Sequence, residues 1–359
     1  KVDRLTGFFR EGGAVRELWS YLKSAKKPIL IYGMGNGADK VLDRLERDGT
    51  AAAGVFASDG FVRGQSFRGF TVISYAAAKE RYGSFIVLVA FGSGRAEVLE
   101  NVARIAAEQE LYVPDMPAYG ETFFDAPFYE SIAERLSAMR SRLADERSRQ
   151  VLDAVVEAKL GGSYERLMSS ADDEDDFRRE LLDLRAGERL FDLGAYRGDT
   201  AERFLAVQPQ LGSLIAVEPD RRNFAKLTAA FGDDERVICV RAAVGEHDGL
   251  SHFTDSSGRN QHVAGSGSAV DTVTVDTLSN RFGAPDVIKF DIEGAELAAI
   301  NGARNTIKNT KPRLYLSAYH RSGDIVALPE AVLALRPDYR VYLRRGKCLP
   351  CWDMYFIFV

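Results

Sequence analysis

Cysteine, long apolar runs and an excess of positive charge are all scarce in this chain of 359 residues. Three cysteines are too few for a disulfide framework, so a cytoplasmic location is expected. The longest clean apolar run, residues 85–91, is far shorter than the ~20 residues that cross a bilayer, and no signal-peptide pattern opens the chain. A net charge of −5 disfavours a protein that binds nucleic acid through a broad basic surface. We therefore expect neither a membrane span nor a nucleic-acid partner.

The chain has ordinary globular composition, with 46% hydrophobic and 28% charged residues, which argues against extensive disorder. Its length indicates at least two domains. The sequence pattern divides it into an N-terminal Rossmann-like α/β domain (residues 1–116), a highly charged helical connector (residues 117–183) and a second α/β domain (residues 184–359).

In the N-terminal part, short apolar strands alternate with helices, which predicts a doubly wound parallel sheet. The first strand runs into residues 33–38, Gly-Met-Gly-Asn-Gly-Ala, and a helix follows. Such a turn brings backbone amides to the N-terminus of a helix, where they attract phosphate. A nucleotide or sugar-nucleotide site is one interpretation, and a module that packs or presents substrate is the one we favour.

The connector carries a stripe of apolar residues at helical spacing, formed by Ile132, Leu136, Met139 and Leu143. We expect a helix packed on its neighbours, and a homodimer seam is the alternative, although two heptads are few for a coiled coil. The acidic run at residues 172–176 is expected to lead into a helix, whose N-terminal end favours carboxylates.

Seven candidate strands lie in the last part of the chain, at residues 189–193, 213–218, 237–241, 286–291, 313–318, 339–343 and 354–359. Seven strands with a closing hairpin are expected of the Rossmann-like sheet of a class I methyltransferase, although the count alone does not separate this α/β fold from other doubly wound folds.

The first of these strands leads into a glycine turn between Gly194 and Gly198, and Glu218 ends the next strand, 24 residues after Gly194. An acidic residue at such a distance accepts hydrogen bonds from both hydroxyls of a ribose, which NAD, FAD and S-adenosylmethionine all contain. The turn lacks the third glycine of a pyrophosphate-binding motif, and this favours S-adenosylmethionine. Asp192 and Asp291, at strand ends, would then meet its positive charges.

An ordered set of segments extends this pattern. They are FDLGA at 191–195, GDT at 198–200, VEPD at 217–220 with Asn223, AAVG at 242–245, GSGS at 265–268, VTVDTL at 273–278, IKFDIEGAE at 288–296 and YH at 319–320. In these segments the chain resembles the FkbM family of S-adenosylmethionine-dependent methyltransferases. The resemblance implies methylation of a hydroxyl oxygen, often on a sugar or a natural product.

The same segments supply the candidate site residues. The cofactor-binding candidates are Asp192, Gly194, Tyr196, Gly198, Thr200, Glu218, Pro219, Asn223, Ala243, Val244, Ser266 and Gly267. The resemblance implies that Ala243 and Val244 flank the adenine and that Ser266 and Gly267 line the active site.

The catalytic candidates are Asp291, Glu293 and His320. With a reference pKa near 6.5, His320 is expected to be largely neutral and to act as the general base. Many members of the family carry a glutamate before this histidine, whereas here Ser317, Ala318 and Tyr319 precede it. The partner that orients His320 is therefore not predicted.

Two further groups of residues offer metal or redox chemistry. Asp291, Glu293 and Glu296 with His320 supply oxygen and nitrogen ligands, but no spacing demands a metal, so we predict none. Glu293 and Glu296 are equally explained as acids at a helix N-terminus. Residues 348–351, Cys-Leu-Pro-Cys, lack the second pair that zinc needs and are expected to form a turn.

The sequence thus predicts a two-domain enzyme that methylates a hydroxyl of a sugar, glycoconjugate or natural product. The alternative is a regulatory protein that binds a nucleotide or sugar nucleotide through its N-terminal domain and carries a degenerate methyltransferase domain.

Overall fold

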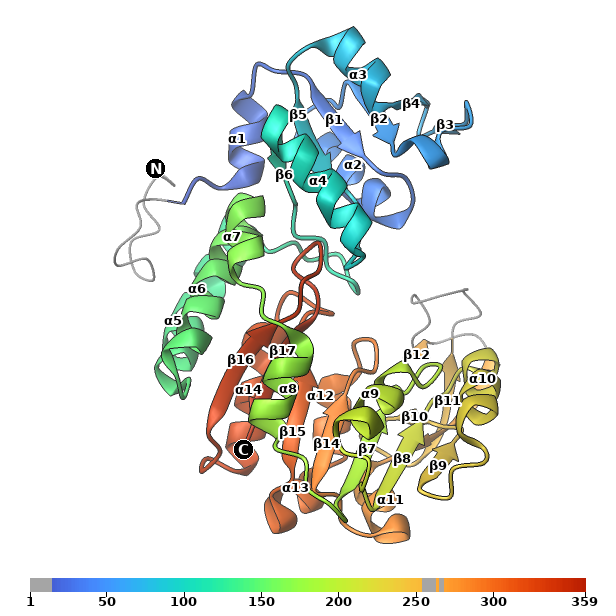
Figure 1. Cartoon of the computed structure of the whole chain (residues 1–359). Coiled ribbons are helices and arrows are strands. Elements are labelled where there is room, and N and C mark those ends of the chain that lie inside the picture. Colours follow the sequence, from blue (N-terminus) through green and yellow to red (C-terminus); the bar gives the residue numbers. More distant parts are fainter. Residues whose placement is uncertain (1–14, 254–262, 265–267) are drawn as a thin grey trace.

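The computed structural model describes residues 15–253, 263–264 and 268–359. Its N-terminal part is an α/β module around a six-stranded sheet of order β3-β4-β2-β1-β5-β6, parallel except for the β3–β4 pair (Figure 1). The strands are Ile29–Tyr32 (β1), Gly54–Ala57 (β2), Ser66–Phe67 (β3), Phe70–Ser74 (β4), Ile86–Val89 (β5) and Glu110–Tyr112 (β6). The helices are Leu18–Ser24 (α1), Asn36–Arg47 (α2), Tyr75–Tyr82 (α3) and Ala96–Glu108 (α4). Strands β1, β2 and β5 are buried throughout, as apolar strands of a covered parallel sheet must be.

Four helices form the connector, and each begins at a residue whose side chain accepts a backbone N–H. They are Ala126–Arg142 (α5), Glu146–Gly161 (α6), Tyr164–Ser169 (α7) and Glu174–Leu182 (α8). Asp173, from the acidic run, caps α8 by accepting from the N–H groups of Asp175 and Asp176, as predicted. The apolar stripe that begins at Ile132 and ends at Leu143 is buried within the chain, so it packs on neighbouring elements and presents no free seam to a second copy.

The third part contains a seven-stranded sheet of order β16-β17-β15-β14-β7-β8-β9, in which β17 alone runs antiparallel to its neighbours. All seven predicted strands are confirmed, with small shifts of their ends. They are Arg189–Leu193 (β7), Ser213–Val217 (β8), Val237–Val240 (β9), Val287–Phe290 (β14), Arg313–Ser317 (β15), Val341–Arg345 (β16) and Met354–Phe358 (β17). The helices are Asp199–Val207 (α9), Arg221–Phe231 (α10), Val275–Phe282 (α11), Glu296–Asn301 (α12), Arg304–Thr310 (α13) and Asp324–Leu335 (α14).

A second, four-stranded sheet of order β10-β13-β11-β12 was not predicted from the sequence. Its strands are Ala243–Val244 (β10), Gly249–Phe253 (β11), Val263–Ala264 (β12) and Ser268–Val273 (β13). They are short or mix polar with apolar residues, so they lack the apolar runs that marked the main sheet.

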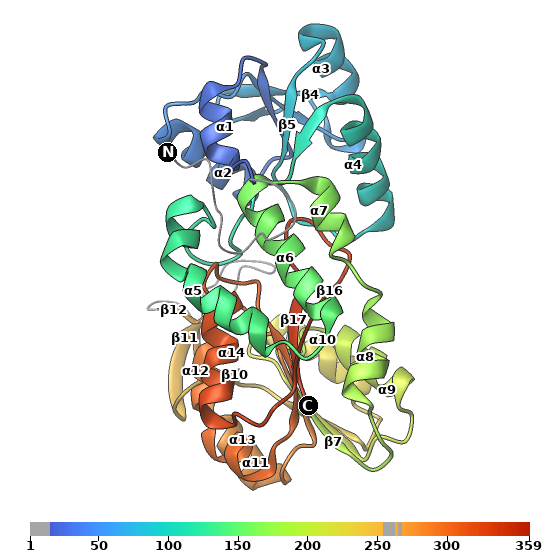
Figure 2. The ribbon, with the colours of Figure 1, turned by 90° about the vertical axis from the view of Figure 1, so that its left-hand side faces the viewer.

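The loop between β16 and β17 joins the third part of the chain to the N-terminal module (Figures 1 and 2). Leu349 and Ser93 exchange two backbone hydrogen bonds of 2.9 and 2.8 Å. The indole N–H of Trp352 donates to the carbonyl of Met116 at 3.2 Å. A Cβ at Gly92 would lie 2.0 Å from the Trp352 ring, so only glycine permits this approach. The Cys-Leu-Pro-Cys segment, with both cysteines buried, is thus part of an interdomain contact.

Candidate active site

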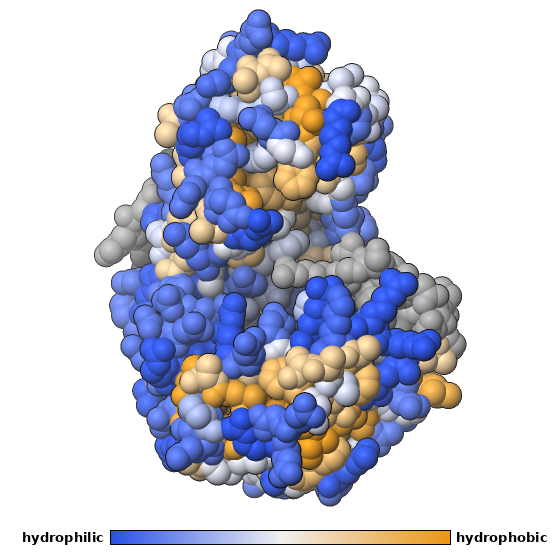
Figure 3. Space-filling view, turned by 45° about the vertical axis from the view of Figure 1, so that its right-hand side comes forward, coloured by the Kyte–Doolittle hydropathy of each residue, from blue (hydrophilic) through white to orange (hydrophobic). Residues whose placement is uncertain are grey.

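A cavity of ≈ 580 Å³ lies between the N-terminal module and the third part of the chain. Its walls are the carboxyl ends of β1 and β5 on one side and those of β7, β8, β14 and β15 on the other, together with the loop before β17. Figure 3 shows the recess between the two parts, with hydrophilic residues along its lower rim. Ligands of open α/β sheets bind at such carboxyl ends, and here the carboxyl ends of two sheets border the same cavity.

Among the described residues, no helix has the length and apolar character needed to cross a bilayer.

The glycine turn after β7 lines this cavity because its backbone packs tightly on the end of β14. Gly194 has φ +80°, and a Cβ there would lie 1.9 Å from the carbonyl oxygen of Asp291. Gly198, with φ +95°, precedes α9, and a Cβ there would meet the Phe231 ring at 2.3 Å. Both positions therefore require glycine, but Gly198 contacts the domain interior and does not line the cavity.

Glu218, at the carboxyl end of β8, presents a buried carboxylate to the cavity. Its two oxygens each accept a backbone N–H, from Tyr196 and from Asp220, both at 2.9 Å. Burial raises the pKa of this carboxyl to about 7, although the two backbone N–H groups lower it in part. Each oxygen keeps a lone pair for a further donor. A buried acceptor with this capacity fits the two hydroxyls of a cofactor ribose.

Asp192 occupies a different place from the one expected. Its side chain is fully buried below the turn, 2.9 Å from the ammonium of Lys289, and it does not line the cavity. Lys289, itself 2% exposed, also donates to the carbonyl of Gly194 at 2.9 Å. Asp192 was expected to meet the positive charges of the cofactor, but in the structure it faces the ammonium of Lys289 instead, and this pair holds the turn from beneath.

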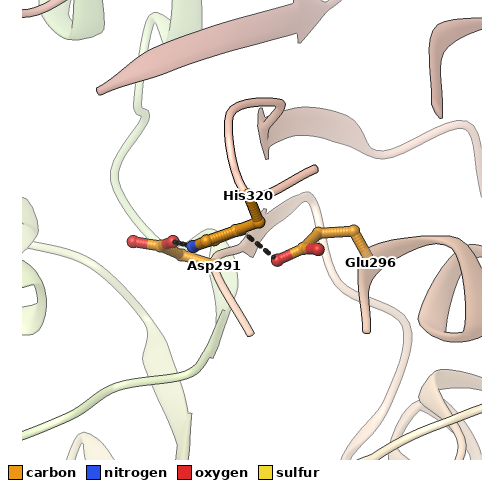
Figure 4. Close-up of side chains that lie close together, drawn as sticks. All are labelled: Asp291, Glu296 and His320. Atoms are coloured by element: carbon orange, nitrogen blue, oxygen red, sulfur yellow. Dashed lines mark ion pairs between the residues drawn. The ribbon is translucent and has the colours of Figure 1, made fainter. Parts of the chain in front are cut away.

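Three candidate catalytic residues come together where β14 and β15 end. His320 is 1% exposed, and its Nε2 lies 3.5 Å from Oδ1 of Asp291 and 3.4 Å from Oε2 of Glu293. On the opposite edge of the ring, Nδ1 lies 2.9 Å from Oε1 of Glu296 (Figure 4). Glu293 has φ +58°, a left-handed conformation that non-glycine residues rarely adopt. Such backbone strain concentrates at functional sites.

The electrostatic surroundings of His320 differ from those expected of a neutral base. Burial lowers the pKa of the imidazole, but the carboxylates of Glu296, Glu293 and Asp291 outweigh it and hold this pKa well above its usual value. This shift favours the protonated ring over the neutral base that was expected, and a protonated ring cannot accept a proton.

Two tyrosines position the acids of this cluster. The hydroxyl of Tyr119, in the connector, donates to Oε2 of Glu293 at 2.8 Å, and its backbone N–H donates to the carbonyl of His320. The hydroxyl of Tyr319 donates to Oδ1 of Asp291 at 3.0 Å. The sequence did not single out Tyr119, and it gave Tyr319 no role. It offered Glu296 as a possible metal ligand or a helix-terminal acid, whereas in the structure Oε1 of Glu296 lies 2.9 Å from Nδ1 of His320.

The remaining candidates divide by position. Those that line the cavity beside Gly194 and Glu218 are Tyr196, Thr200, Pro219, Asn223, Ala243 and Val244. Ser266 and Gly267 lie outside the described residues.

Comparison with known proteins agrees with this geometry. Residues 192–342 match the family model described as the methyltransferase FkbM domain. No curated protein matches the chain. The crystal structure of methyltransferase FkbM from Methylobacillus flagellatus KT is similar, with a TM-score of 0.71 and 23% identity over 93% of this chain and 90% of that one. At this identity the likeness shows the fold, and it extends across the N-terminal module and the connector.

Two other solved methyltransferase-fold proteins match only about half of the chain. One is precorrin-6y C5,15-methyltransferase from Geobacter metallireducens GS-15, with 12% identity over 51% of this chain and 84% of that one and a TM-score of 0.35. The other is fibrillarin from Aeropyrum pernix, with 10% identity over 48% of this chain and 66% of that one and a TM-score of 0.30. We draw no argument from scores this low. Residues 192–342 thus match the methyltransferase FkbM domain on a seven-stranded sheet of the expected order, and the cofactor that this match implies is S-adenosylmethionine.

Proposed function

We propose that this domain transfers a methyl group to a hydroxyl oxygen of a small acceptor, namely a sugar, a glycoconjugate or a natural product. The observation that carries the proposal is the shared cavity. Glu218 and the glycine turn border one side, the Asp291–His320 cluster borders the floor, and the N-terminal module closes the far side. An acceptor in this space would lie between the cofactor side and a group of proton-accepting carboxylates.

The cofactor, when bound, supplies an electrophilic methyl group on a sulfonium. The chain therefore has mainly to hold and orient the two reactants, an effect that lowers the barrier of a two-substrate reaction substantially. Glu218 accepts from the ribose hydroxyls, Gly194 shapes the turn, and Ala243 and Val244 offer a buried apolar surface beside them. Asp291 presents negative charge at the edge where positive charge has to be held.

The acceptor hydroxyl has to lose its proton as its oxygen becomes methylated. The carboxylates of Asp291 and Glu293 border the cavity where that proton would be released. Since the surrounding carboxylates raise the pKa of His320, we assign proton acceptance to these carboxylates and assign to His320 the role of keeping them in place. The tyrosine hydroxyls fix the same two carboxylates.

The N-terminal module would contribute to acceptor selection. Asn36, Lys40 and Arg95 reach the cavity from this module, and Lys347 reaches it from the loop before β17. Lys40 also donates to the carbonyl of Pro117 at 2.8 Å, which ties α2 to the start of the connector. Their polar and cationic character suits an acceptor rich in hydroxyl or anionic groups.

The test is transfer of a labelled methyl group from S-adenosylmethionine to a panel of glycans, polyhydroxylated natural products, amines and nucleic acids. We expect label on a hydroxyl oxygen. Glu293→Gln should lower kcat by about 10²–10⁴-fold, the range for a positioned base, with little change in cofactor affinity. Glu180→Gln, an exposed acid on α8, is the matched control. Label found only on nitrogen or carbon would refute the proposal.

A further inference from the structure

We propose that Asp291, Glu293 and Nε2 of His320 bind a divalent cation, Mg²⁺ or Mn²⁺, beside the acceptor position. This inference rests on the proposed function only for what the cation does, not for whether it binds. Carboxylate oxygens with one imidazole nitrogen are ligands that these cations accept. Nε2 of His320 lies 3.5 Å from Oδ1 of Asp291 and 3.4 Å from Oε2 of Glu293, so both acids reach the same nitrogen. Glu296 adds a further carboxylate, with one ligand atom each of Asp291, Glu296 and His320 within 4.8 Å of one another.

The distances at Nε2 suit ligands of one cation better than partners in a hydrogen bond. Nε2 lies 3.4 and 3.5 Å from the facing oxygens of Glu293 and Asp291, beyond the ordinary N–H···O range of about 2.7–3.2 Å. Two ligands at about 2.1 Å from one ion stand roughly 3.0–3.4 Å apart, for octahedral and tetrahedral angles respectively. His320 is almost fully buried, and its Nε2 lies within 3.5 Å of both oxygens.

Figure 4 shows Asp291 and Glu296 on opposite sides of the His320 ring. Glu296 faces Nδ1, and its Oε1 already accepts from the N–H groups of Ile292 and Gly294 at 3.0 and 3.3 Å. A metal-bound histidine usually donates its other N–H to a carboxylate, which fixes the ring. Glu296 therefore fills this outer position, and Glu293, whose side chain is 36% exposed, supplies the third ligand.

The proposed ligands also have the hydrogen-bonding support that metal-bound carboxylates usually have. Tyr319 donates to Asp291 and Tyr119 donates to Glu293, so each acid is oriented from outside the cluster. The left-handed backbone at Glu293 places its side chain on the cavity side of the turn. The support thus comes from three separate parts of the chain, the connector, the turn after β14 and the residue before His320.

The charge of the cluster calls for a cation. Three carboxylates surround one histidine, and Glu293 and Glu296 form ion pairs with no other cationic side chain of the described residues. Lys289 lies 3.9 Å from Asp291 but is shared with Asp192. A divalent cation binds only the neutral ring, so cation and proton compete for Nε2.

In the proposed reaction the cation would stabilise the alkoxide of a coordinated acceptor hydroxyl. The O–H and C–S bonds break, the C–O bond forms, and the proton passes to a free carboxylate oxygen of the cluster.

The binding test uses the full chain, freed of metal by dialysis against EDTA. Titration with Mn²⁺, followed by the electron paramagnetic resonance of the free ion, should show one site per chain that Mg²⁺ displaces. Asp291→Asn, Glu293→Gln and His320→Gln should each weaken Mn²⁺ binding at least tenfold, and Glu296→Gln by about 10–100-fold through loss of ring orientation. Glu180→Gln is the control and should bind as wild type does. Thermal unfolding shows that each variant is folded.

The outcomes separate the cation from the methyl transfer. No Mn²⁺ binding, or binding unchanged in Asp291→Asn and Glu293→Gln, overturns the site. Binding lost in Glu296→Gln but kept in Glu293→Gln overturns the assignment of ligands. Methyl transfer to a hydroxyl that proceeds equally in EDTA, with no Mn²⁺ bound, refutes the cation and leaves the proposed function standing. Mn²⁺ bound in a protein that methylates no hydroxyl supports the cation site and refutes the proposed function.

Discussion

Glu218 is the residue whose replacement tests the cofactor site most directly. It is 6% exposed, it borders the cavity, and its two oxygens hold the backbone N–H groups of Tyr196 and Asp220. The same oxygens are expected to accept from the ribose hydroxyls. Glu218→Ala removes these acceptors together, whereas Glu218→Gln keeps the size of the side chain and one of its oxygens.

The expected loss follows from the hydroxyls that would lose their partner. An unsatisfied buried polar group costs about 1–3 kcal/mol, which corresponds to a loss of affinity of about 5- to 150-fold. Glu218→Gln should lie between wild type and Glu218→Ala, because an amide retains one acceptor but turns a donor toward one of the two backbone N–H groups.

The pH dependence gives a second, independent measurement. Since burial raises the pKa of Glu218 to about 7 and the hydroxyls donate to its ionised form, affinity should fall as the pH falls through 7. At pH 6 about a tenth of the carboxyl is ionised, so affinity should be up to about tenfold weaker than at pH 8. Binding at pH 6 should also release a proton, because the ligand favours the ionised state.

Calorimetric titration with S-adenosylhomocysteine at pH 6, 7 and 8 measures all three quantities. Heats recorded in buffers of different ionisation enthalpy give the number of protons released. The Glu218→Gln protein should lose the pH dependence while remaining folded. Wild-type affinity in a folded Glu218→Ala protein, or the same pH dependence in Glu218→Gln, would refute the placement of the ribose on this residue.

Two further predictions concern the parts that hold the site together. Lys289→Met leaves the Asp192 carboxylate buried without a partner and should lower the free energy of unfolding by about 3–5 kcal/mol. The double variant Asp192→Leu/Lys289→Met should recover part of this loss. Denaturant unfolding of the full chain measures both variants, and a double variant no more stable than Lys289→Met would contradict the pairing. In Gly92→Val the new side chain would collide with the Trp352 ring, which should destabilise the contact between the N-terminal module and the loop before β17 by about 1–3 kcal/mol. Thermal unfolding measures this loss. Cofactor affinity measured by calorimetry should stay as in wild type, because Glu218 is untouched.

The sheet of the methyltransferase domain could be predicted because its strands are local features of the sequence. Residues such as Phe191 and Ile288 lie in short apolar runs that are fully buried in the structure. The four-stranded sheet could not be predicted in this way. Ser268–Val273 pairs with Gly249–Phe253, and its polar side chains carry no apolar run that marks a strand.

The residues on the proposed cofactor side of the cavity were likewise accessible to prediction, because they belong to strand–turn–helix units. Gly194 and Glu218 each follow an apolar strand, and parallel strands bring their carboxyl ends to one edge. Asp192 shows the limit of this reasoning. Its position at a strand end is compatible with a side chain on either face of the sheet. The structure shows that the Asp192 side chain points inward, because it lies 2.9 Å from the buried ammonium of Lys289.

On the proposed acceptor side, Asp291, Glu293 and His320 were predicted, but the contacts that hold them were not, because these contacts join segments that are distant in the sequence. Tyr119 reaches Glu293 across 174 positions, and Trp352 reaches Met116 across 236. No periodicity or motif spacing records such contacts, since they exist only once the connector has placed the N-terminal module over the sheet edge. The raised pKa of His320 has the same origin. Its ordinary pKa suggested a neutral base, but the three carboxylates gathered around the buried ring favour its protonated form. Residue type and position along a strand can therefore identify which groups reach the reacting edge, whereas their charge states depend on neighbours that only the folded chain supplies.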